Sequence, residues 1–124
     1  MTKSKSTHVM IVEDDKFILK AMEYTFSKAG FQVKVAPSAE EAFQILRIWT
    51  PHVIILDILL PGVDGYEFLR IIKDDPKFKS IPVIISSNLD EDMDANDGSI
   101  EYVVKSDLDL DRLVEKVKNL SVHT

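Results

Sequence analysis

Short apolar runs separated by longer segments of helical period most narrowly limit how this chain can fold. The runs are rich in Val and Ile, and in the segments between them the apolar residues recur every three to four positions. This alternation is typical of a parallel sheet covered by helices. We therefore expect an α/β fold whose five strands are residues 8–12, 31–35, 53–56, 83–85 and 102–104.

Four helices are predicted from apolar periodicity and from residues that start or stop helices. The first stops at Gly30, and the second starts at the N-cap Ser38 and ends before Pro51. The others are predicted at about residues 65–74 and 109–120. The residues expected to face the core are Ile18, Met22, Thr25, Phe26, Ala29, Ala42, Phe43, Leu46, Trp49, Phe68, Leu69, Ile72, Leu110, Leu113, Val114 and Val117.

The segment 89–99 (LDEDMDANDGS) occupies the place of a further helix but has few apolar residues to anchor one. We expect at best a short, frayed helix there. Its acidic residues lack the spacing of a Ca²⁺-binding loop, so they are expected to form a solvated face.

Length and composition indicate one domain. The chain has 124 residues, of which 45% are hydrophobic, and its formal net charge is −6. We expect a domain over residues 8–120 with flexible tails at 1–7 and 121–124. The absence of cysteine excludes disulfides, thiolate zinc sites and cysteine nucleophiles. The negative charge argues against direct nucleic-acid binding, and with no signal peptide or membrane span in the sequence we expect a soluble, cytoplasmic protein.

Polar residues follow most of the predicted strands. An acidic triplet at 13–15 follows the first strand, Asp57 the third, Ser87 lies at the end of the fourth, and Lys105 follows the fifth. The carboxyl ends of parallel strands meet at one edge, where ligands bind. Crowded carboxylates repel one another, and a hard cation with oxygen ligands relieves that repulsion. The pattern predicts a Mg²⁺ site beside a phosphoryl group whose other oxygens are held by Lys105 and Ser87.

Each of these residues also has an ordinary structural interpretation. An acidic triplet before a helix often forms only a solvated turn that caps the helix. What favours a site is that the residues fall on successive strand ends. His8, His52 and His123 have no spacing typical of a metal site, and we expect them to be structural or solvated.

Four motifs make the chain similar to the receiver domain of two-component response regulators, the chemotaxis-Y-like family. They are VEDD at 12–15, LDILLPGVDG at 56–65, PVIISS at 82–87 and YVVK at 102–105. The resemblance extends from about residue 8 to residue 120. It implies a doubly wound five-stranded parallel sheet of flavodoxin-like order 2-1-3-4-5.

The resemblance implies that Asp57 is the phospho-acceptor, which takes a phosphoryl group from a sensor histidine kinase or a phosphotransfer protein. It also implies that Mg²⁺ is bound by Asp14, by Asp57 and by the backbone carbonyl of Leu59, with Glu13 acting through water. Asp15 is then expected to cap the first helix.

The resemblance also assigns the switch. Ser87 would bond a phosphoryl oxygen, Lys105 would pair with its charge, and Tyr102 would move inward as Ser87 shifts toward the phosphoryl group. The protein-interaction surface changed in this way would bind a downstream protein.

The chain departs from the family pattern near this switch. Ser106 replaces the proline that usually follows the lysine, and we expect a trans bond there because a cis bond costs ~3 kcal/mol without proline. The interval from Ser87 to Lys105 is shorter than usual by roughly four residues, about one helical turn. Leu59 and Leu89 are expected to exclude water and so to slow hydrolysis of the phosphoryl group. Replacing them with Asn and Glu should then make hydrolysis faster.

Other functions are weaker candidates. A Mg²⁺-dependent phosphatase would need an acid where Leu59 stands, and a flavin carrier would need a phosphate-binding loop in place of the acids at 13–15. The main alternative is a receiver-like scaffold that acts without phosphorylation. We expect a monomer or weak homodimer that is not an enzyme beyond its self-catalysed phosphorylation and slow dephosphorylation. Whether it stands alone or belongs to a longer chain stays open.

Overall fold

The fold alternates strands and helices along the chain in the predicted manner. The computed structural model describes residues 7–57, 65–87, 100–104 and 109–121. In chain order the elements are β1 (His8–Val12), α1 (Lys16–Lys28), β2 (Gln32–Ala36), α2 (Ala39–Leu46), β3 (Val53–Asp57), α3 (Gly65–Asp74), β4 (Val83–Ser87), β5 (Ile100–Val104) and α4 (Leu110–Ser121). The expected further helix at 89–99 lies outside the described residues.

The five strands form one parallel sheet in the order β2-β1-β3-β4-β5. This order confirms the predicted flavodoxin-like topology. The register pairs Val12 with Leu56 and Asp57 with Ser86, so the carboxyl ends of the central strands are level. Polar groups at those ends therefore meet at one edge.

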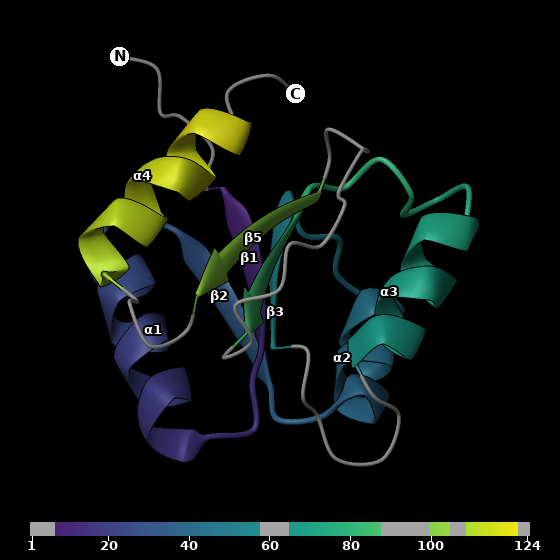
Figure 1. Ribbon diagram of the computed structural model, residues 1–124, viewed down its shortest axis with the longest axis horizontal. Coiled ribbons are helices and arrows are strands. Elements are labelled where there is room, and N and C mark those ends of the chain that lie inside the picture. The colour runs from purple at the N-terminus through teal and green to yellow at the C-terminus, as the bar shows by residue number, and fades with distance from the viewer. Residues whose placement is uncertain (1–6, 58–64, 88–99, 105–108, 122–124) are drawn as a thin grey trace.

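Two helices cover each face of the sheet. In Figure 1, α1 and α4 lie on one side and α2 and α3 on the other. Alternate strand residues serve the two layers: Val9 and Ile11 pack beneath α1 and α4, whereas Met10 and Val12 pack beneath α2 and α3. All five residues of β3 are buried, which confirms that this strand is covered on both faces.

Local signals set the helix ends. Asp15 caps α1, and the hydroxyl of Ser38 accepts a hydrogen bond of 3.2 Å from the Glu41 N–H at the start of α2. Gly30 follows α1 with φ of 101°, a conformation that residues with a Cβ rarely adopt. These features confirm the predicted N-caps and the glycine stop.

The inward face of α1 differs from the prediction. Leu19 is buried with Met22 and Phe26, although it was not expected in the core, and Ala29 is exposed as the C-cap residue. Ile18 and Leu19 are adjacent apolar residues, about 100° apart around the helix. Packing against the sheet and α4 determines which of the two is buried, and sequence periodicity alone does not distinguish them.

None of the helices in the described part of the chain combines the length and apolar character needed to cross a membrane.

Candidate functional site

The site is built on the two central strands of the sheet. Glu13 directly follows β1, and Asp57 is the last residue of β3. The Glu13 N–H donates to the carbonyl of Ala36 at 3.0 Å, which extends the pairing of β1 with β2 past the strand end. Both acidic residues therefore stand on backbone that is hydrogen-bonded to its neighbours, and their positions are set by the sheet.

Three carboxylates gather at this edge. One oxygen each from Glu13, Asp14 and Asp57 can be chosen so that all three lie within 4.8 Å of one another. Glu13 is 1% and Asp57 3% exposed, whereas Asp14 is exposed. Packing like charges together with little water is unfavourable unless a cation or a proton compensates. An all-oxygen set of this kind suits a hard divalent cation such as Mg²⁺.

Asp15 has a different role from its neighbours. Its Oδ1 atom accepts from the N–H groups of Phe17 at 2.9 Å and Ile18 at 3.2 Å. Its own N–H donates to Glu13 Oε2 at 3.1 Å. Asp15 thus caps α1, as predicted, and also orients the buried Glu13 carboxylate, a contact that was not predicted. The prediction missed it because the donor is a backbone group.

Ser86 is a further polar residue at this edge, and its burial beside Asp57 was not predicted. It pairs with Asp57 in the register of β3 and β4, so the two side chains lie on the same face of the sheet. Ser86 is 1% exposed, and its hydroxyl has no hydrogen-bond partner in the described part of the chain. A buried hydroxyl of this kind is costly. The sequence signal that could have found it is the alternation of strand residues.

Other predicted site residues lie wholly or partly outside the described residues. The backbone of Ser87 ends β4, and Tyr102 pairs with Ile85 in β5, but the side chains of Ser87 and Tyr102 are not described. Four other residues named in the sequence analysis lie outside the described residues: Leu59, Leu89, Lys105 and Ser106.

The two described histidines lie at the amino ends of β1 and β3, opposite the carboxylates. The His8 N–H donates to His52 Nδ1 at 2.9 Å, and the His8 ring stacks on Trp49 with centroids 4.6 Å apart. This packing confirms their predicted structural role. The third histidine, His123, lies outside the described residues.

Comparison with known proteins agrees with this arrangement. Residues 9–118 match the family described as "Response regulator receiver domain". The chain is 32% identical over 123 residues to the polar-differentiation response regulator DivK of Brucella ovis, covering 96% of each protein. It is 34% identical over 101 residues to the transcriptional regulatory protein AfsQ1 of Streptomyces coelicolor, which covers 78% of this chain but 44% of that relative.

Solved structures agree as well. The Francisella response regulator 1452 receiver domain superposes with a TM-score of 0.83 and 28% identity, covering 95% of this chain and 98% of that one. The chain spans less than half the length of several curated relatives, including AfsQ1 and both CseB proteins.

Proposed function

Because the chain belongs to the response regulator receiver domain family, we propose that Asp57 accepts a phosphoryl group from the phosphohistidine of a sensor kinase or phosphotransfer protein. The observation that carries the proposal is the group of three carboxylate oxygens, one each from Glu13, Asp14 and Asp57, within 4.8 Å. Related response regulators of similar length, such as DivK, support it. The protein then acts as a switch, and its output is a changed surface for a downstream protein.

The transfer itself needs a fixed nucleophile. A carboxylate oxygen of Asp57 attacks phosphorus, the bond from phosphorus to the histidine nitrogen breaks, and that nitrogen keeps the bonding electron pair. Asp57 ends a strand that is paired on both sides, so its backbone position is set before the donor arrives. Such preorganisation lowers the entropic cost of an in-line approach.

The metal would be held by the residues around this nucleophile. We assign Asp14, Asp57 and the backbone carbonyl of Leu59 as direct ligands of Mg²⁺, with Glu13 acting through water. When bound, Mg²⁺ neutralises charge on the phosphoryl oxygens. Asp15 supports this arrangement because its N–H holds Glu13 Oε2 at 3.1 Å.

The phosphoryl group would then be linked to the surface by three further residues. The Ser87 hydroxyl would donate a hydrogen bond to a phosphoryl oxygen, and the Lys105 ammonium would pair with the phosphoryl charge. The Tyr102 side chain would then turn inward. Ser87 stands at the carboxyl end of β4, beside the strand of Asp57, which supports its part. We place this activity in the cytoplasm, within a domain of residues 8–120, and with no direct contact to nucleic acid.

Intact mass after incubation with acetyl phosphate tests the proposal. We expect one phosphoryl adduct that requires Mg²⁺, that is lost in Asp57→Asn and that persists in the matched control Asp74→Asn, an exposed carboxylate at the end of α3. A folded protein that gains no adduct from acetyl phosphate or from a phosphorylated histidine phosphotransfer protein would contradict it. That result would favour a scaffold that works without phosphorylation.

A further inference from the structure

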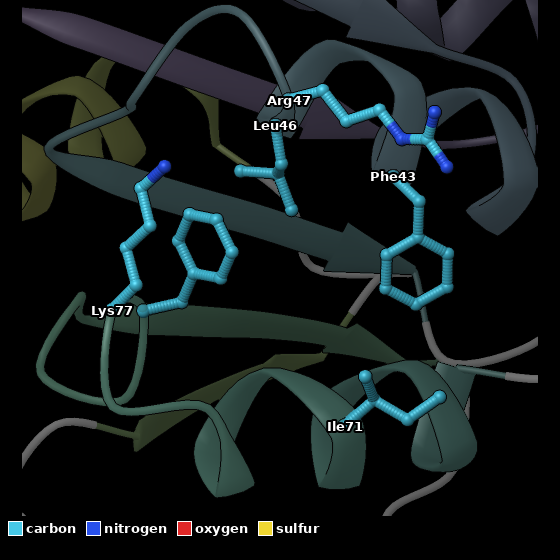
Figure 2. A pocket seen from close by; sticks show the side chains of 6 residues that line it. Phe43, Leu46, Arg47, Ile71 and Lys77 are labelled. Carbon is cyan, nitrogen blue, oxygen red and sulfur yellow. The ribbon is translucent and has the colours of Figure 1, made fainter.

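A second surface feature lies over the face of the sheet that α2 and α3 cover. An open groove of about 660 Å³ runs between α2 and the turn that follows α3 (Figure 2); it is lined by Phe43, Leu46, Arg47, Ile71, Lys77 and Phe78. Leu46 and Arg47 lie at the carboxyl end of α2, and Lys77 and Phe78 precede β4. In a parallel α/β fold, these helix ends lie near the amino ends of the strands. This part of the groove therefore points away from the acidic edge, and no lining residue belongs to the group of three carboxylates.

The walls and floor of the groove are mainly apolar. Leu46 is buried at its base, Phe43 and Phe78 are half-buried, and Ile71 is 36% exposed. A concave site in which large apolar side chains remain open to solvent is a typical place for another molecule to bind.

Two cations border this apolar surface. Figure 2 shows the side chains of Lys77 and Arg47 on opposite sides of Leu46. The Lys77 ammonium lies 5.4 Å from the centroid of the Phe78 ring. Neither cation forms an ion pair with an acid in the described part of the chain. Both charges are exposed and can pair with acidic groups of a bound molecule.

The wall formed by the turn is held in place. The Lys73 ammonium donates to the carbonyls of Lys79 at 3.1 Å and Ile81 at 2.9 Å. The Phe78 N–H donates to the Asp75 carbonyl at 3.0 Å. A wall that is already ordered loses little entropy when a partner binds.

We infer that this groove docks a short segment of a partner protein in which apolar side chains are flanked on both sides by Asp or Glu. The apolar residues fill the groove and the acids pair with Arg47 and Lys77. The net charge of −6 disfavours a long polyanion such as nucleic acid. Because only two cations border the groove, the partner needs few acids, and these lie close to its apolar residues. An open groove suits a peptide better than a small molecule, whose binding site usually encloses it.

Selection from a phage-displayed library of random 12-residue peptides tests this inference on the unphosphorylated chain. The same library is panned against Arg47→Glu/Lys77→Glu and against a matched control, Lys20→Glu/Lys28→Glu, which reverses two exposed lysines on α1. We expect enriched peptides with apolar residues between acids. Their affinity should fall at least about tenfold in the groove variant and stay within about twofold in the control. Adding salt should weaken binding.

Amide chemical shifts on adding one enriched peptide locate the site. We expect the changes to cluster on the residues that line the groove. Enriched peptides that are basic, that bind the groove variant equally well, or that shift other regions would overturn the inference, as would no enrichment. Sedimentation equilibrium of the free chain tests the other occupant: a dimer broken by Arg47→Glu/Lys77→Glu would assign the groove to a second copy. Circular dichroism confirms that each variant is folded.

Discussion

The two ends of β1 and β3 are built in opposite ways. At their carboxyl ends, the buried carboxylates of Glu13 and Asp57 lie beside each other. At their amino ends, His8 stacks on Trp49 and its N–H donates to His52 Nδ1, so the groups there satisfy one another. We therefore expect the carboxyl ends to provide a site that attracts a cation and the amino ends to stabilise the fold through packing. Substitutions at the two ends should separate stability from function.

The largest effect on stability is expected at the amino end. Trp49→Ala removes a half-buried ring that stacks on His8 at 4.6 Å, and should lower the free energy of unfolding by about 2 kcal/mol. Urea unfolding measures this change, while the rate of labelling by acetyl phosphate should stay unchanged. The neighbouring Ile48→Ala is the control, because Ile48 is 84% exposed and contributes little. A loss of labelling in folded Trp49→Ala would show that the two ends are coupled.

A smaller effect is expected from metal at the carboxyl end. Mg²⁺ at ten times its dissociation constant should raise the free energy of unfolding by about 1.4 kcal/mol, because it binds only the folded chain. Asp14→Asn should lose most of this gain, since it removes one of the three grouped carboxylates. Thermal unfolding with and without MgCl₂ gives the difference. Asp111→Asn on α4 should respond as the unchanged protein does, and an equal response in Asp14→Asn would remove Asp14 from the metal site.

The smallest effect concerns the buried hydroxyl beside Asp57. Ser86→Ala removes a polar atom that has no hydrogen-bond partner in the described part of the chain, and should raise the free energy of unfolding by up to about 1 kcal/mol. Ser38→Ala is a control of opposite sign, because it removes the N-cap of α2 and should cost about 1 kcal/mol. Chemical denaturation of both variants makes the comparison. Destabilisation by Ser86→Ala would mean that the hydroxyl stabilises the fold.

The fold could be predicted because local signals and topology agree. Apolar periodicity predicted α3 at about residues 65–74, and the capping residue Ser38 marked the start of α2. The cap at Asp15, which is also observed, followed from the family resemblance. The order of strands followed from the family resemblance and is the one observed. Predictions of this kind succeed where the pattern depends on neighbours in the sequence.

Features that depend on distant neighbours were not predicted. The choice of Leu19 for the core is made by packing against other elements. The groove requires α2 to lie next to the turn around Phe78, and Phe43 was expected simply to face the core. For the site, the grouping of Glu13 with Asp57 followed from strand ends, whereas the contact from the Asp15 N–H to Glu13 needed the backbone path.

The place of the site on β1 and β3 also determines how long it persists. Each of these strands has a neighbour on both sides, and residues such as Ile11 and Ile55 are fully buried. Backbone amides in such positions exchange with deuterium only when the whole domain opens. The strands that carry Glu13 and Asp57 should therefore be among the last to exchange. The backbone that carries these carboxylates would then open only when the whole domain unfolds, which is far slower than the rearrangement of a surface loop.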